Sequence, residues 1–218
     1  MPADVIAFSV QTGSGGYSIA HHVADRLSMR YYDWEITSEA AARAGVTPND
    51  VIAAERVPGF MERMMRRLGT ISTMTIEGSP GFADPSPAVW NTAIQGLTSE
   101  DYRQFIEKVV EELADRGSAV IVGHAAQRVL QDHSGVLRVL VHGSQDKRAT
   151  RLAVEQAVDI TKAEVMVKQS DKDRRELLKR VYHFDWLDAS FYDVTLNTDH
   201  LSDDFAADAI VAGAKAYP

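Results

Sequence analysis

The sequence predicts a three-layer α/β domain with a central parallel sheet of five strands and helices on both faces. Five short apolar runs are continuous rather than alternating, which is typical of strands covered on both faces of a parallel sheet. Amphipathic helical patterns lie between these runs, and strands that alternate with helices indicate βαβ units with right-handed crossovers. The length of 218 residues, of which 45% are apolar, suits one domain with a sizeable core.

The five predicted strands are short and mostly rich in β-branched residues. They are, in chain order, Val5–Val10, Arg30–Tyr32, Ala119–Val122, Val136–Val141 and Val194–Leu196. The second run is the least apolar of them.

Helical periodicity appears in the segments between the strands. Ile19, Val23 and Leu27 recur every four residues and mark one face of a helix after the first strand. Further helices are predicted over 98–116, where Gly117 supplies the stop, from near Asp146, from a capping pair of Thr161 and Glu164, and over about 203–214.

The connection between the second and third predicted strands, about residues 34–118, is long for a compact domain. Residues 78–87 within it are rich in glycine and proline, which excludes regular secondary structure there. Long irregular connections inside a compact domain are usually functional or mobile. We see no internal repeat and no second domain, so residues 1–218 are expected to form one domain.

Charge and cysteine content narrow the function classes. The formal net charge of −8 disfavours binding to a nucleic-acid polymer, which needs a basic face, but it permits a small anionic ligand in a locally basic cleft. The chain has no cysteine, which excludes disulfides, thiolate metal sites and a cysteine nucleophile. The N-terminus lacks signal-peptide features and no apolar run is long enough to span a membrane, so we expect a cytoplasmic protein without a membrane partner.

The first predicted strand runs into a glycine-rich loop that opens a helix. The residues expected to bind phosphate are Thr12, Gly13, Ser14, Gly15, Gly16, Tyr17 and Ser18. Glycines allow a sharp turn and let backbone N–H groups approach a ligand, and a helix N-terminus adds free donors and a partial positive charge. The junction of the first strand and first helix is where P-loop proteins bind phosphate.

The spacing of this loop departs from the standard P-loop pattern. With Ser18 in the terminal Ser/Thr place, where it would contact Mg²⁺, the lysine place holds Gly16. A Rossmann pattern is not met either, because Ser18 stands where its third glycine belongs. A plain strand-to-helix turn therefore stays open as the alternative to a phosphate site.

Further motifs follow in order over nearly the whole chain. They are Gln11-x-Gly13-Ser14-Gly15-Gly16-x-x-Ile19, Tyr31-Tyr32-Asp33-x-Glu35-Ile36, Val120-Ile121-Val122-Gly123 followed by Ala125-Ala126, Asp171-Lys172-x-Arg174, Asp185-Trp186 and Tyr192-Asp193-x-x-Leu196-Asn197-Thr198. As an ordered set they resemble the cytidylate kinase-like family of P-loop nucleoside and nucleotide kinases.

The resemblance implies a P-loop kinase fold with an acceptor-binding insert at about 34–98 and a lid at about 155–186. It implies ATP-dependent phosphoryl transfer, with Mg²⁺, to a nucleoside monophosphate such as cytidylate or to a related small acceptor. Members of the family commonly carry arginine where this sequence has Val10 and His124. With the missing lysine, this loss of positive charge supports an alternative, a catalytically weak or inactive nucleotide-binding or regulatory protein.

Four residues of two later segments are candidates for catalysis. Arg148 and Arg151 follow the fourth strand and share a helix face, and the resemblance implies arginines that face the phosphates there. Asp171 and Arg174 match the Asp-x-x-Arg of the lid, which implies that Arg174 contacts phosphate and that Asp171 orients it or holds a sugar hydroxyl. The alternatives are solvated helix charges and a face laced with salt bridges.

Asp33 ends the second strand at the carboxyl edge of the sheet, where ligands bind in open α/β folds. It is a candidate to accept the acceptor's proton or to hold Mg²⁺ through water, and its alternative role is a helix N-cap. Arg63, Arg66 and Arg67 are candidates to bind an acceptor phosphate, or they form the polar face of an amphipathic helix. His124 is expected to be a structural histidine.

Overall fold

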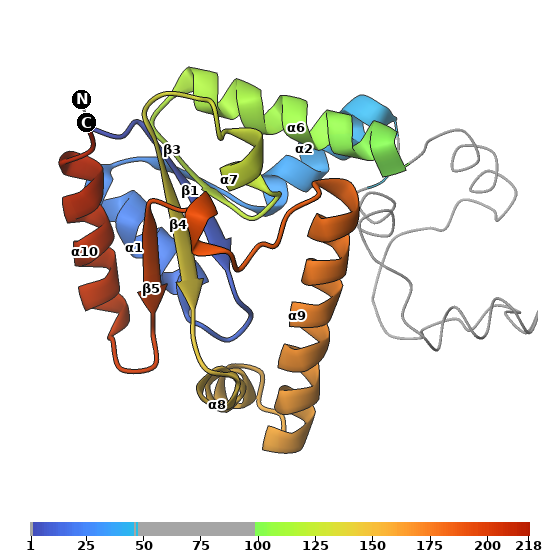
Figure 1. Cartoon of the computed structure of the whole chain (residues 1–218), viewed down its shortest axis with the longest axis vertical. Coiled ribbons are helices and arrows are strands. Elements are labelled where there is room, and N and C mark those ends of the chain that lie inside the picture. The colour runs from blue at the N-terminus through green and yellow to red at the C-terminus, as the bar shows by residue number, and fades with distance from the viewer. Residues whose placement is uncertain (1, 46, 48–98) are drawn as a thin grey trace, which may run out of the picture.

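The computed structural model describes residues 2–45, 47 and 99–218. Its centre is a five-stranded parallel sheet in the order β2-β3-β1-β4-β5 (Figure 1). The strands are β1 (Val5–Val10), β2 (Arg30–Tyr32), β3 (Ala119–Val122), β4 (Val136–His142) and β5 (Val194–Asn197). The α/β class, the parallel sheet and all five predicted strands are confirmed, and β4 and β5 extend slightly beyond their predicted ends.

Strand β1 lies in the middle of the sheet, which explains its unbroken apolar run. Val5 pairs with Ala119 of β3 on one side and with Val136 of β4 on the other. Every residue of β1 is buried, because helices cover both faces of the sheet. Phe8 belongs to the core cluster on one face and Ala7 to the cluster on the other, as the alternation of side chains along a strand requires.

Two layers of helices enclose the sheet (Figure 1). The helices are α1 (Gly16–Leu27), α2 (Trp34–Ala44), α6 (Ser99–Arg116), α7 (Ala126–Val129), α8 (Gln145–Glu155), α9 (Ile160–Val181) and α10 (Asp203–Lys215). One face is covered by α1 and α10, whose residues Ile19 and Ile210 join the core there. The other face is covered by α2, α6 and α7, with Ile36 and Val110 in its core.

Helices α8 and α9 lie at the end of the sheet to which the strands point (Figure 1). They pack on each other through a small apolar cluster in which Ala149 and Leu152 of α8 meet Ala163 and Val167 of α9. Helix α9 falls within residues 155–186, the segment that the sequence predicts as a lid, and the contact with α8 places it against the carboxyl edge of the sheet.

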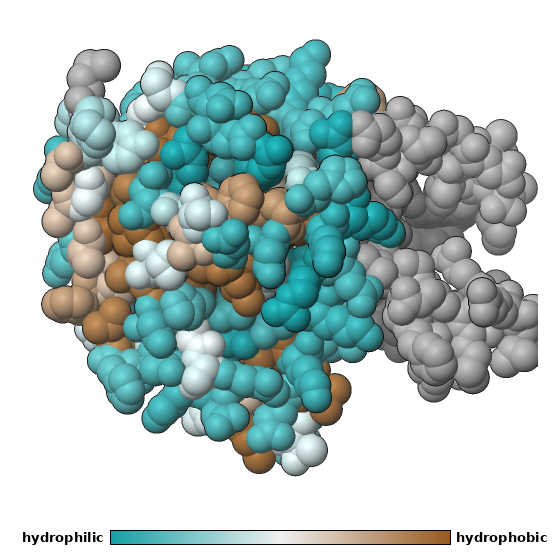
Figure 2. Space-filling view, in the orientation of Figure 1, coloured by the Kyte–Doolittle hydropathy of each residue, from teal (hydrophilic) through white to brown (hydrophobic). Residues whose placement is uncertain are grey.

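Some apolar side chains remain on the surface of the molecule. Figure 2 shows a mostly hydrophilic surface over α6, with apolar patches at the left and centre of the view and a few apolar groups at its lower end. Val154 of α8 and Val165 of α9 are exposed. Phe184 and Trp186 are buried and pack against Leu140 of β4. These two aromatic residues are therefore part of the core.

The start of α9 differs from the prediction. The N-cap is Asp159, whose Oδ1 accepts a hydrogen bond from the N–H of Lys162 at 2.9 Å, and not Thr161. Asp159 has extended backbone, with φ −67° and ψ 156°, which an N-cap residue adopts. Thr161 already lies inside the helix, where its hydroxyl cannot cap the first turn.

Several predictions about the long connection lie outside the described residues. These are the irregular stretch at 78–87, the helix start at Thr98 and most of the expected insert at about 34–98. One domain with an insert and a lid stays a prediction.

The cap at α9 gives a direct test of the structure. Asp159→Ala should lower the free energy of unfolding by about 1 kcal/mol, because one orphan N–H of the first turn loses its acceptor. Thr161→Ala is the matched control and should change stability by less than about 0.5 kcal/mol. Urea unfolding of both variants measures the difference, and an equal loss in both would contradict Asp159 as the cap.

Candidate functional site

The carboxyl ends of the strands bring five connecting segments to one edge of the sheet. The glycine-rich loop follows β1, Asp33 follows β2, Gly123 follows β3, Gly143 follows β4 and Thr198 follows β5. The chain goes from β1 to β2 and β3 on one side, and then crosses to β4 on the other. Ligands in open α/β sheets bind outside the carboxyl ends at such a reversal of strand order.

Glycine is required in the loop by both conformation and space. Gly13 and Gly15 each have φ +77°, a left-handed conformation that other residues adopt at a cost. A Cβ on Gly13 would lie 2.3 Å from the carbonyl oxygen of Arg148, and one on Gly16 would lie 2.6 Å from Val10 Cγ1. The loop therefore packs its backbone directly against α8 and β1.

Two arginines of α8 donate to the carbonyl groups of this loop. Thr12 O accepts from Arg148 Nη1 at 3.1 Å, and Ser14 O accepts from Arg151 Nη1 at 2.9 Å. Ser14 O also accepts from the buried hydroxyl of Thr198 at 2.8 Å. The N–H groups of Gly13 and Gly15, in contrast, find no acceptor within the described residues. The loop thus keeps amide donors at the N-terminus of α1, which is the arrangement that binds anions.

Arg148 is buried and forms an ion pair with Asp171. It is 3% exposed, and it donates to both carboxylate oxygens of Asp171, at 3.1 and 2.6 Å. Its Nε donates to the carbonyl of Gly143 at 2.9 Å. The carboxylate of Asp171 thus pairs with Arg148, and its expected role in orienting the lid contact or in holding a sugar hydroxyl stays a prediction. Arg148 also supports the loop through its hydrogen bond to Thr12 O. Its guanidinium therefore donates to protein carbonyl and carboxylate oxygens.

Two further side-chain contacts join α9 to the loop and to Gln11 before it. The hydroxyls of Thr12 and Ser170 are 2.7 Å apart, and Gln11 Nε2 donates to Asp171 at 3.4 Å. Polar side-chain contacts therefore hold the start of the loop against α9.

Arg174 has no carboxylate partner within the described residues. Its Nη1 donates to the carbonyl of Val10 at 2.5 Å, and its guanidinium lies 5.1 Å from the centre of the Trp186 ring. Val10 is the last residue of β1, so this guanidinium lies where the loop begins. No described carboxylate forms an ion pair with it, so its N–H groups are available to a ligand.

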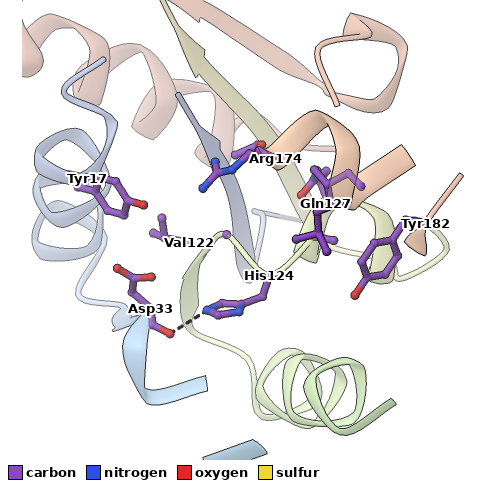
Figure 3. Close-up of a pocket in the computed structure, with 12 residues that line it drawn as sticks. Tyr17, Asp33, Val122, His124, Gln127, Arg174 and Tyr182 are labelled. Atoms are coloured by element: carbon purple, nitrogen blue, oxygen red, sulfur yellow. Dashed lines mark hydrogen bonds between the residues drawn. The ribbon is translucent and has the colours of Figure 1, made fainter. Parts of the chain in front are cut away.

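A cavity of about 160 Å³ opens beside Arg174. Figure 3 shows Tyr17 and Asp33 on one side of it and Gln127 and Tyr182 on the other, with Arg174 and His124 between them. Three of these residues, Tyr17, Asp33 and Arg174, were predicted from the sequence as site residues, and the structure brings them together.

The carboxylate of Asp33 lines this cavity without a capping role. Asp33 is at the N-cap position of α2, but its side chain makes no cap hydrogen bond. Its backbone N–H donates instead to Glu35 Oε2 at 3.2 Å. Burial raises the pKa of Asp33, the Glu35 carboxylate raises it further, and Arg174 opposes both. A carboxyl group with a raised pKa in a cleft is a candidate acid or base.

His124 holds Asp33 in place. Its Nε2 lies 3.1 Å from the carbonyl oxygen of Asp33, and since a carbonyl can only accept, Nε2 carries the hydrogen. Burial lowers the pKa of His124 to about 4, so the ring is neutral at neutral pH. Gly123, His124 and Ala125 all have positive φ, of 83°, 53° and 52°, which turns the chain sharply at the cavity.

The remaining candidates are distributed as follows. Ser18 is exposed in the first turn of α1, and the described residues contain no cluster of three or more His, Asp or Glu side chains positioned to hold a metal ion. Arg63, Arg66 and Arg67 lie outside the described residues. Gln127 and Tyr182 were not predicted from the sequence, because a lone polar residue in a short helix and an aromatic residue at the end of a long helix carry no motif.

None of the helices in residues 2–45 and 99–218 combines the length and the apolar character needed to cross a membrane.

Residues 5–200 match the model of the cytidylate kinase-like family. A cytidylate kinase from Methanopyrus kandleri is 26% identical over 107 residues, which make up 45% of this chain and 55% of that protein. The match therefore covers about half of the length of this curated relative.

Two solved structures are similar to this chain to different degrees. An uncharacterized protein from Eubacterium ventriosum has a TM-score of 0.67 at 19% identity, and the match covers 97% of this chain and 98% of that one. This likeness shows a common fold. Shikimate kinase from Acinetobacter baumannii, in complex with shikimate, has a TM-score of 0.47 at 13% identity, with 97% and 91% covered.

The buried ion pair predicts strong coupling between α8 and α9. Arg148→Met should lower the free energy of unfolding by about 2–4 kcal/mol, because it leaves the Asp171 carboxylate without its partner. Adding Asp171→Leu should recover part of this loss, since the unpaired charge is then gone. Urea unfolding in a double-mutant cycle measures the coupling, and simple additivity of the two single losses would refute it.

Proposed function

This chain belongs to the cytidylate kinase-like family, and on that premise we propose that it transfers the γ-phosphoryl group of ATP to a small acceptor. The named acceptor is a nucleoside monophosphate, cytidylate or a close relative, and the proposed setting is the cytoplasm. The position of Arg174 carries the proposal. Its guanidinium contacts the end of β1 at 2.5 Å and lines the neighbouring cavity.

A cation between two binding places suits phosphoryl transfer. The reaction needs positioning and positive charge around the moving group more than covalent chemistry by the protein. With the phosphates of ATP on the loop and an acceptor in the cavity, Arg174 would lie between them. Because its charge is unpaired by any described carboxylate, it is free to strengthen its interaction as charge develops in the transition state.

The loop fits the phosphates of ATP. The free N–H groups of Gly13 and Gly15 and the N-terminus of α1 supply donors, and Arg151 adds positive charge at Ser14 O. ATP bound with Mg²⁺ would supply the phosphoryl group in a partly neutralised form. In this proposal Ser18, in the first turn of α1, would approach the metal ion as a hydroxyl ligand.

In this proposal Asp33 acts on the acceptor. Its carboxylate lines the cavity, makes no cap bond, and has a raised pKa through burial. A carboxylate in this setting can accept the proton of an attacking hydroxyl group or orient it. His124 keeps the backbone of Asp33 fixed through its hydrogen bond.

A catalytically weak or inactive nucleotide-binding protein is the second candidate function. Specific observations favour it: the loop has no lysine, the charge of Arg148 is balanced by Asp171, and a Cβ on Gly15 would lie 3.1 Å from the Asp203 carboxylate. A carboxylate this close to the loop repels phosphate unless a metal ion lies between them.

One assay separates these functions. Purified protein with ATP, Mg²⁺ and a panel of nucleosides and nucleoside monophosphates should release ADP above background with at least one acceptor. If ATP raises the melting temperature and no acceptor causes ADP release, the binding protein is the better description. If other phosphate esters stabilise the protein and ATP does not, the loop binds a different anionic metabolite.

Arg174→Ala should reduce turnover by on the order of a hundredfold, because a transition-state donor is lost from a site shielded from water. Stability should fall by only about 1 kcal/mol, the scale of one hydrogen bond and one cation–π contact. The matched control is Arg175→Ala, an exposed arginine in the next position of α9. Turnover and thermal melting of both variants measure the effect, and unchanged turnover in Arg174→Ala would remove its role.

Asp33→Asn should have opposite effects on activity and stability. Turnover should fall about a hundredfold or more, since the amide accepts no proton. The raised pKa means that the folded state disfavours the ionised carboxylate, so the substitution should raise the melting temperature at neutral pH, with a gain that fades as the pH falls through the raised pKa. Melting curves and rates as a function of pH measure both effects. A loss of stability at neutral pH would contradict this description of Asp33.

A further inference from the structure

Gln127 carries a buried acceptor that no described residue uses. It is 2% exposed, lies on α7 and lines the cavity. Its Nε2 donates to the hydroxyl oxygen of Tyr192 at 3.2 Å, while its Oε1 is buried without a hydrogen-bond partner within the described residues. A buried polar atom without a partner is costly to the fold, so it indicates a ligand that completes it.

The orientation of this amide is fixed by its neighbours. The hydroxyl of Tyr192 donates to the carbonyl of Trp186 at 2.6 Å, and a carbonyl can only accept. The hydrogen of Tyr192 is therefore committed, and its oxygen can only accept from Gln127. Turning the amide over would place Oε1 against another oxygen without a hydrogen between them. Gln127 thus keeps its Nε2 on Tyr192 and leaves Oε1 as an acceptor.

We propose that Gln127 Oε1 is a specificity-determining acceptor that selects a hydrogen-bond donor, an amino or hydroxyl group, on a neutral ring of the phosphoryl acceptor. This inference rests on the proposed function, because it assigns the cavity to the acceptor. A ligand with a carbonyl oxygen at the same position would place one acceptor against another, because neither that oxygen nor Gln127 Oε1 carries a hydrogen. Discrimination against it follows from the locked amide, without any charge.

The shape and lining of the cavity suit a ring. Val122, Leu177 and Leu178 provide apolar wall, which suits the faces of a ring. The volume of about 160 Å³ is below the roughly 300 Å³ of pockets that enclose a whole drug-sized ligand. The cavity therefore encloses one part of the acceptor. Asp33 lies on the side of the cavity opposite Gln127, and Arg174 lies between them (Figure 3), where the reacting group would be.

Binding without ATP tests this inference separately from turnover. Isothermal titration calorimetry would compare cytidine 5′-monophosphate, uridine 5′-monophosphate and ribose 5-phosphate. The first two differ by an amino group against a carbonyl at one ring position, and the third has the sugar without a base. If Gln127 contacts the amino group, the wild type should bind the cytidine nucleotide about tenfold or more tightly than the uridine nucleotide, on the scale of one unmade buried hydrogen bond.

Three variants complete the experiment. Gln127→Leu keeps the approximate volume and removes the acceptor, so it should abolish the tenfold preference. Tyr192→Phe removes the hydroxyl that fixes the amide, so it should reduce the preference while the cytidine nucleotide still binds. This second variant keeps the test valid should Gln127→Leu fold poorly. Gln104→Leu, an exposed glutamine of α6, is the control and should leave every affinity within about twofold of the wild type.

The outcomes separate the possible donors and the two proposals. Equal wild-type binding of all three probes, with each weakened about tenfold by Gln127→Leu, supports a sugar hydroxyl as the donor. Affinities that Gln127→Leu leaves within about twofold, or no binding of any probe to the wild type, overturn the inference. Donor-selective binding without ADP release would retain this site and reject phosphoryl transfer, whereas ADP release without selectivity would do the reverse.

Discussion

The geometry of the site depends on the buried guanidinium of Arg148. It holds Thr12 O in the loop, Gly143 O at the end of β4 and the carboxylate of Asp171 on α9. Three segments far apart in the sequence are thereby fixed around one charge, and a buried charge of this kind is tolerable because its hydrogen bonds are satisfied. The pair also sets the position of α9, and with it the position of Arg174, which is one helical turn beyond Asp171.

Three arginines surround the loop that has no lysine. Arg148 and Arg151 bind carbonyl oxygens of the loop, and Arg174 binds the last carbonyl of β1. Each of these bonds is to a carbonyl oxygen, the negative end of a peptide dipole. The backbone N–H groups of the loop therefore stay available to an anion. Charge is therefore distributed over the loop's outer side instead of being delivered by one flexible side chain, and Arg174 is the member without a carboxylate partner in the described part of the chain.

The cavity on the other side of Arg174 combines groups that are unfavourable for the fold. Asp33 has a pKa raised by burial, Gln127 has an unpartnered buried oxygen, and His124 and Ala125 have left-handed backbone. Each of these features costs stability, and such costs gather where a ligand or a reaction offsets them. All four of these residues line the same cavity.

The sequence by itself determined the fold class, the five strands and the place of the glycine loop, because hydrophobic period and glycine position are local properties. The ordered motifs also predicted Asp33, Asp171 and Arg174 as candidate site residues, and all three lie at the carboxyl edge of the sheet or on α9 beside it. Tertiary structure alone decided their partners: Asp171 binds Arg148 and not Arg174, and Asp159 caps α9 in place of Thr161. It also found Gln127, whose role depends on Tyr192 and Trp186, residues distant in the chain. Pairing and burial arise when the sheet brings its carboxyl ends together, so no local pattern encodes them.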